Sequence, residues 1–305
     1  MLRRSALLLP FASLLPTGGR AQTPADANAA PLAVVASFSI LGDLVREVGG
    51  DRVTVRTLVG TNGDAHVFQP RPSDAAALRE AAVVVRNGLN LEPWLDRLVR
   101  SAGTRARMVT ATEGVTPRRM EDDGHGHGSI DPHAWQDLRH GQVFVRNIAA
   151  GLAAADPAGA ETYARNAEAL RGRLAALDGW VREQVASVPD ARRKVITSHD
   201  AFGYFGAAYG ISFIAPQGMN TESEPSAAQV ARLIRQVRAQ NITAVFIENM
   251  TNPALLDRLA REAGVRVRGE LFSDALSPPE GPAPTYEAMF RHNLGLLVPA
   301  MRGEG

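Results

Sequence analysis

No cysteine occurs among the 305 residues of the chain. This absence excludes disulfide bonds, thiolate zinc sites, iron–sulfur clusters, CxxC redox pairs and a cysteine nucleophile. Any metal ion that this protein binds must therefore be held by histidine, aspartate or glutamate side chains. The sequence holds 7 histidines, so their positions decide whether it has a metal site.

An excess of charge of either sign is also absent. There are 33 Lys+Arg against 32 Asp+Glu, which gives a formal net charge of +1. This balance gives no electrostatic support for nucleic acid or an anionic membrane surface as a partner. Apolar residues make up 45% and charged residues 21%, which is ordinary for a globular protein. The length predicts two domains of about 150 residues each.

No run of apolar residues is long enough to cross a membrane. Residues 1–21 are instead typical of a secretory signal peptide, because Arg3 and Arg4 precede a short apolar stretch and small residues flank a cleavage point after Ala21. Residues 22–31 then form a flexible leader rich in alanine and proline. A lipoprotein needs a cysteine at the cleavage point, so we expect a periplasmic protein that is not membrane-anchored.

Strands and helices alternate through the first half of the chain. Apolar runs predict strands, and helical spacing of apolar residues predicts helices between them. This alternation predicts an α/β lobe over residues 32–155, with a parallel sheet covered by helices on both faces. The expected strands are 32–39, 53–59, 82–86 and 107–111, and the expected helices are 40–48, 73–81 and 92–101.

One long helical stretch follows at residues 156–189. Its apolar residues recur at steps of three or four, as an amphipathic helix requires. About 30 residues at about 1.5 Å each give a rod of about 45 Å, so we expect this helix to link two lobes. The apolar positions are Tyr163, Ala167, Leu170, Leu174, Leu177, Val181 and Val185.

The alternation returns in residues 190–305, which predicts a second α/β lobe of similar architecture. Ser226 and Gln229 form a capping pair at the start of one of its helices. The expected strands are 194–197, 211–215, 244–248 and 265–271, and the expected helices are 201–209, 226–240, 253–263 and 285–301.

Three histidines and one aspartate follow predicted strands or begin loops: His66, His133, His199 and Asp274. Open parallel sheets place ligands outside the carboxyl ends of their strands, so two facing lobes could bring these four side chains into the cleft between them. Three imidazoles and one carboxylate suit a tetrahedral zinc ion, and a full set of four leaves no open position for catalysis. Taken singly, each histidine is better explained as a core or surface residue than as a metal ligand.

The sequence around these residues resembles the solute-binding proteins of metal-ion ABC importers, in the zinc/manganese cluster. The resemblance covers residues 32–302 and rests on several motifs together. These are Gly63-Asp64-Ala65-His66, Asp131-Pro132-His133-Ala134-Trp135, TSHDAFGYF at 197–205, TESEPS at 221–226, FSDALS at 272–277 and Thr285-Tyr286.

The resemblance implies two α/β lobes joined by a long helix, with a metal site in the inter-lobe cleft. His66, His133, His199 and Asp274 correspond to the family's metal ligands. A histidine at position 199, where manganese-selective members usually have glutamate, resembles the zinc-selective branch. The first motif has Ala65 where the family usually has proline, which predicts a looser loop before His66.

Other residues near these motifs have less certain roles. Glu248, Asp64 and Asp200 are rival candidates for accepting a hydrogen bond from a ligand imidazole. The loop at 121–129 carries His125 and His127, which form either an auxiliary weak zinc site or part of a solvated loop.

These observations together predict a zinc-binding component of an ABC importer and not an enzyme. It is expected to be a monomer that captures one Zn²⁺ per chain and delivers it to an inner-membrane ABC permease, with a periplasmic zinc chaperone as an optional second partner. One alternative is a manganese- or iron-binding importer component of the same fold. A less favoured alternative is a secreted zinc hydrolase, for which no HExxH or GxSxG motif is present.

Overall fold

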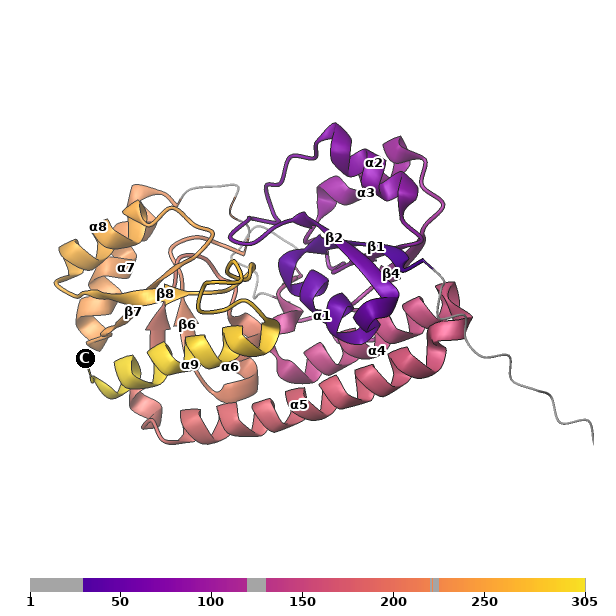
Figure 1. The fold of residues 1–305 in the computed structure, drawn as a ribbon. Coiled ribbons are helices and arrows are strands. Elements are labelled where there is room, and N and C mark those ends of the chain that lie inside the picture. The colour runs from indigo at the N-terminus through magenta and orange to yellow at the C-terminus, as the bar shows by residue number, and fades with distance from the viewer. Residues whose placement is uncertain (1–29, 120–129, 220, 222–224, 305) are drawn as a thin grey trace, which may run out of the picture.

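The computed structural model describes residues 30–119, 130–219, 221 and 225–304. The predicted signal peptide at 1–21, most of the leader and the loop at 121–129 with His125 and His127 lie outside these residues. Within them, the chain forms two α/β lobes that share a long helix along one side (Figure 1). The predicted fold class is therefore confirmed.

The N-terminal lobe is built on a parallel sheet with the strand order β2-β1-β3-β4. Helices α2 and α3 lie on one face of this sheet, and α1 and α4 lie on the other (Figure 1). The strands are β1 (Leu32–Phe38), β2 (Val53–Val59), β3 (Val83–Arg86) and β4 (Arg107–Thr110), and the helices are α1 (Ser39–Gly49), α2 (Pro72–Glu80), α3 (Pro93–Ala102) and α4 (Leu138–Ala155).

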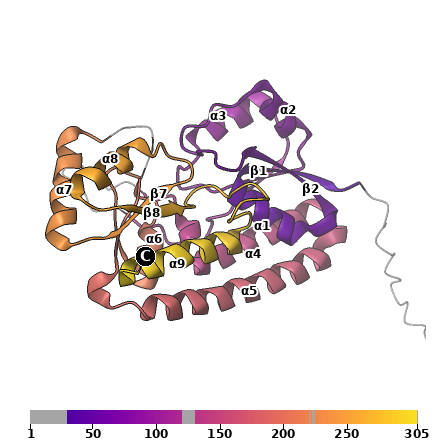
Figure 2. The ribbon, with the colours of Figure 1, turned by 60° about the vertical axis from the view of Figure 1, so that its left-hand side comes forward.

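The C-terminal lobe repeats this plan with a parallel sheet of order β6-β5-β7-β8. Helices α7 and α8 pack on its outer side, while α6 and α9 face the long helix α5 (Figures 1 and 2). The strands are β5 (Lys194–Ile196), β6 (Ser212–Ile214), β7 (Ala244–Glu248) and β8 (Val267–Leu271), and the helices are α6 (Gly203–Tyr209), α7 (Ala227–Gln240), α8 (Ala254–Ala263) and α9 (Tyr286–Arg302). The capping pair of Ser226 and Gln229 starts α7.

Helix α5 (Ala160–Ala186) runs along both lobes (Figure 2). It is shorter than the stretch predicted at 156–189, because a 3-10 turn at Pro157–Gly159 precedes it. Asp156 fixes that corner by accepting hydrogen bonds from Arg52 and Tyr163. All seven apolar positions predicted from the sequence are buried, so the periodicity identified the face of α5 that packs on the lobes.

Helix α4 was not among the predicted elements. Gly141 and Gly151 interrupt its apolar pattern, and glycine lowers helix propensity. The tertiary structure requires small residues here, because a Cβ atom on Gly151 would lie 2.3 Å from Cγ2 of Val109 in β4. Packing of the helix on the sheet thus outweighs the local preference of the sequence.

A single apolar core extends through both lobes. It includes Val84 of the first sheet, Phe144 of α4, Leu174 of α5 and Phe246 of the second sheet. A separate, smaller cluster lies between the second sheet and helices α7 and α8, with Val237, Val245 and Leu259 among its members. The two lobes are therefore joined by shared core packing in addition to the chain connection. Among the described residues, no helix is both long and apolar enough to span a membrane.

We predict that Gly151→Val lowers the free energy of unfolding by about 1–3 kcal/mol, because the added methyl groups overpack the contact of α4 with β4. Gly172→Val is the matched control, since Gly172 is a glycine of α5 whose Cβ position has open space around it. Both substitutions replace glycine by valine inside a helix, so they change the helix propensity by the same amount. Equal loss of stability in the two variants, measured by urea denaturation, would contradict this account.

Candidate metal centre

Four segments bring the candidate metal-binding side chains to the region between the lobes. His66 lies in the loop that follows β2, and His133 immediately precedes a 3-10 turn at Ala134–Gln136. His199 follows β5 and Asp274 follows β8, both in the C-terminal lobe. Each lobe thus supplies two of the four groups.

The four side chains converge on one point. Their candidate ligand atoms all lie within 4.8 Å of one another. The Nε2 atoms of His66 and His199 lie 3.1 Å and 3.2 Å from Oδ2 of Asp274. Nε2 of His133 lies 3.6 Å from the same oxygen and 3.3 Å from Nε2 of His66. All three rings therefore point the same type of nitrogen at one carboxylate oxygen.

These separations fit the edges of a metal coordination polyhedron. Zn–N and Zn–O bonds of about 2.1 Å in a tetrahedron place ligand atoms about 3.4 Å apart. The observed distances of 3.1, 3.2, 3.3 and 3.6 Å surround that value. A small divalent cation therefore fits among the four groups with little rearrangement.

The electrostatics of the cluster also favour a cation. Asp274 is fully buried, and its Oδ1 has no hydrogen-bond partner among the described residues. Burial raises the pKa of Asp274, but His133 and His199 outweigh that effect and hold the pKa well below its usual range. A buried carboxylate charge requires a compensating positive charge, supplied either by protons on the imidazoles or by a metal ion.

Asp131 holds His133 from behind. Its Oδ1 accepts hydrogen bonds from Nδ1 of His133 at 2.8 Å and from the backbone N–H of His133 at 3.0 Å. These contacts leave Nε2 free to face the cluster, which is how outer carboxylates orient metal-binding imidazoles. Burial lowers the pKa of His133, but the charge of Asp274 and the hydrogen bond to Asp131 raise it to about 9.

Glu248, at the end of β7, has the corresponding place behind His199. Its Oε1 accepts a hydrogen bond from the backbone N–H of His199 at 2.9 Å. Its Oε2 lies 2.7 Å from Nδ1 of His199, which makes a close charge contact behind the ring. Burial lowers the pKa of His199, yet Glu248 and Asp274 raise it well above its ordinary value.

Asp64 supports the loop of His66, and in the described residues its carboxylate forms no hydrogen bond with a cluster imidazole. Its Oδ1 accepts from the backbone N–H of His66 at 2.8 Å, and its Oδ2 accepts from Oγ1 of Thr221 at 2.6 Å. Ala65 is fully buried, and its carbonyl accepts a hydrogen bond from Nε1 of Trp94. These contacts hold the backbone on both sides of Ala65, the position at which the resemblance predicts a looser loop.

Within the described part of the chain, the side chain of Asp200 makes no hydrogen bond with a cluster imidazole, although burial and the nearby Asp131 raise its pKa. Sequence reasoning gave no role to Asp131, which makes the stronger contact. The signal was present, because Asp131 stands two residues before His133 in a motif already singled out. An aspartate two residues before a histidine can accept hydrogen bonds from the backbone N–H and the ring of that histidine.

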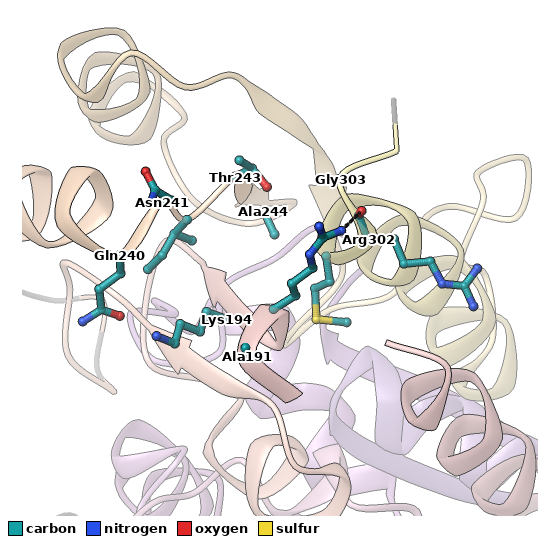
Figure 3. A pocket seen from close by; sticks show the side chains of 11 residues that line it. Ala191, Lys194, Gln240, Asn241, Thr243, Ala244, Arg302 and Gly303 are labelled. Carbon is teal, nitrogen blue, oxygen red and sulfur yellow. Dashed lines mark hydrogen bonds between the residues drawn. The ribbon is translucent and has the colours of Figure 1, made fainter. Parts of the chain in front are cut away.

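The cluster is distinct from the cavity in Figure 3, which has a volume of about 460 Å³. That cavity is lined by Lys194 and Thr243 near the amino ends of β5 and β7, and by Arg302 at the end of α9. No histidine or carboxylate residue lines it, so it offers no alternative metal site. A second cavity of about 390 Å³ is lined by Asp64 and Ser198, which neighbour His66 and His199 along the chain.

We predict that metal binding releases protons at about pH 7. The pKa of about 9 places a proton on His133 in the metal-free chain at that pH, and a bound metal ion must displace it. Affinity should therefore fall as the pH drops below about 9, and proton release should diminish as the pH rises through that value. Titration calorimetry in buffers of different ionisation enthalpy measures this release. A binding enthalpy that is the same in all buffers near neutral pH would contradict the displacement of a proton from His133 by the metal ion.

Comparison with known proteins shows the family of the chain. Residues 34–300 match the family described as ZnuA, zinc-uptake complex component A, periplasmic. The chain is 33% identical over 295 residues to the manganese-binding lipoprotein MntA of Halalkalibacterium halodurans, covering 96% of each protein. It is 32% identical over 299 residues to the iron-binding protein YfeA of Yersinia pestis, covering 97% of this chain and 96% of that relative.

A solved structure shares the fold as well. The periplasmic zinc-binding protein TroA from Treponema pallidum superposes with a TM-score of 0.84 at 28% sequence identity, covering 90% of this chain and 99% of that one. The family match spans most of the chain, and the relatives are covered over nearly their full lengths. The chain therefore belongs to the ZnuA family of metal-binding solute-binding proteins, which are non-enzymatic components of ABC importers and act with the transporter's membrane components.

Proposed function

We propose that this chain captures one divalent transition-metal ion per molecule and delivers it to the permease of an ABC importer. His66, His133, His199 and Asp274 are its proposed ligands. The observation that carries this proposal is the convergence of four buried candidate ligands, two from each lobe, on a single point. A site between two lobes suits a carrier, because a small displacement of the ligands of one lobe relative to those of the other would divide the ligand set and release the ion.

Binding is favoured over catalysis by the number of protein ligands. Catalytic zinc sites keep one position open for water or substrate, whereas structural sites are closed by four protein groups. The four proposed ligands would fill all four positions of a tetrahedron. The secreted hydrolase considered from the sequence is therefore not proposed.

Two observations bear on which ion is carried. Three imidazoles with one carboxylate suit zinc, and a histidine at position 199 resembles the ligand set of the zinc-selective branch. The names of the relatives MntA and YfeA instead favour manganese or iron. Equilibrium affinity does not decide between them, because nitrogen and oxygen sites generally bind zinc more tightly than manganese or ferrous iron. We favour manganese or iron as the transported ion and keep zinc as the second candidate. A periplasmic zinc chaperone is proposed as a partner only if the transported ion is zinc.

We further propose that the chain acts in the periplasm after removal of residues 1–21. MntA is named a lipoprotein, but lipid attachment of that type needs a cysteine, and this sequence has none. The proposal is therefore a carrier that is not lipid-anchored.

The ligand assignment predicts a stoichiometry of one metal ion per chain and a strong effect of His199→Ala. This substitution removes a proposed ligand and should weaken binding by more than about 100-fold, beyond the loss typical of residues behind the ligands. His292→Ala is the matched control, because His292 contacts the carbonyl of Glu270 and lies outside the cluster. Competition with a fluorescent chelator measures both affinities, and equal affinities would contradict the assignment.

Uptake in cells tests the identity of the transported ion. Cells that depend on this chain and its permease should lose accumulation of manganese or iron when the chain is deleted, and zinc accumulation should persist. Radioactive tracers of the three metals provide the measurement. Loss of zinc accumulation alone would support the zinc carrier instead.

A further inference from the structure

A chain of polar contacts continues outward from His133 to the protein surface. Asp131, which is fully buried, holds His133 with Oδ1 and pairs through Oδ2 with Nη1 of Arg118 at 3.1 Å. The backbone of the two segments is also joined, because the N–H of Asp131 donates to the carbonyl of Arg118 at 3.0 Å. Arg118 is therefore two contacts away from a proposed metal ligand, with its side chain 37% exposed.

The opposite lobe encloses this ion pair. Gly203 is the first residue of α6, and a Cβ atom there would lie 2.1 Å from Nη1 of Arg118 and 2.6 Å from Oδ2 of Asp131. The next residue, Tyr204, accepts a hydrogen bond from the backbone N–H of Arg118 at 2.8 Å and donates from its hydroxyl to the carbonyl of Asp131 at 3.1 Å. The start of α6 thus requires a glycine because the guanidinium and carboxylate occupy the space of a side chain.

Charge balance gives the pair a purpose beyond packing. A divalent cation among the ligands would have three buried carboxylates around it, namely Asp274, Asp131 and Glu248. Together they exceed the charge of the cation by one, and the partly buried Asp200 adds a further acidic group beside Asp131. The guanidinium of Arg118 is the positive group that pairs with Asp131. Without that partner, the outward oxygen of Asp131 would lose its ion pair, and the carboxylate would be freer to rotate away from Nδ1 of His133.

We propose that Arg118 is a positioning residue for metal binding, which acts through Asp131 to fix the ring of His133, and that α6 of the opposite lobe holds Arg118 in place. This inference rests on the proposed function, since it concerns the same metal site. It assigns to Gly203 a steric role in ligand geometry, and it connects the contact between the lobes to the orientation of one ligand.

Two substitutions disturb the pair by different means. Arg118→Gln removes the charge, and Gly203→Ala displaces the guanidinium with a methyl group while leaving the charge in the chain. Each should weaken cobalt(II) binding by about 10–100-fold, the usual effect of residues that orient metal ligands. Gly179→Ala is the matched control, because Gly179 in α5 has open space around its Cβ position. Arg118→Lys, which keeps the charge, should restore part of the lost affinity.

The absorption spectrum of bound cobalt(II) separates positioning from a general effect on folding. At saturating cobalt, the visible ligand-field bands of full-length Arg118→Gln and Gly203→Ala should be shifted relative to the wild type, while the thermal melting curves of the metal-free proteins stay close to it. The double variant should be no weaker than the worse single variant, since both changes break one contact.

Wild-type affinity and an unshifted spectrum in both variants would overturn the inference while leaving the proposed function intact. Lowered affinity in fully additive steps would also overturn it, because the two residues would then act separately. Failure of the wild type and of Gly179→Ala to bind cobalt(II) would instead overturn the proposed function, and this inference with it.

Discussion

The buried charge of Asp274 is the constraint on which the rest of the site depends. Its carboxylate lies at the centre of three imidazole nitrogens and receives no backbone hydrogen bond in the described part of the chain. Such a charge is stable in the interior only beside positive charge, and protons or a metal ion can supply it. Metal binding is then an exchange of cations at a site whose oxygen and nitrogen atoms are already in place.

The fold supplies that arrangement from two directions. Parallel strands end on the same edge of each sheet, so the segments after β2, β5 and β8 bring candidate ligands to the region between the lobes. The shared core along α4, α5 and α9 then keeps the two edges facing each other. Buried carboxylates behind His133 and His199 fix two of the rings, while His66 is held mainly through its loop. The packed core and the hydrogen bonds behind the rings both keep the candidate ligand atoms close together.

Much of this could be predicted from the sequence. Periodicity identified the strands and the buried face of α5, because burial repeats along an isolated element regardless of its partners. The four candidate ligands were identified through their motifs, since residues so far apart give no local sign that they converge. Helix α4 was missed because tertiary packing selects its glycines, and the part played by Asp131 depends on a ring orientation that only the folded chain reveals. The transported metal is not encoded in ligand type alone, because one donor set binds several divalent ions.

X-ray absorption spectroscopy of the metal-loaded full chain tests the central claim most directly, because it counts the imidazoles around the ion without depending on which ion is bound. We expect a shell of nitrogen and oxygen atoms with the multiple-scattering pattern of three imidazoles, and a loss of one oxygen ligand in Asp274→Ala, which removes the carboxylate. A shell with fewer than three imidazoles, or one that Asp274→Ala leaves unchanged, would contradict this ligand set.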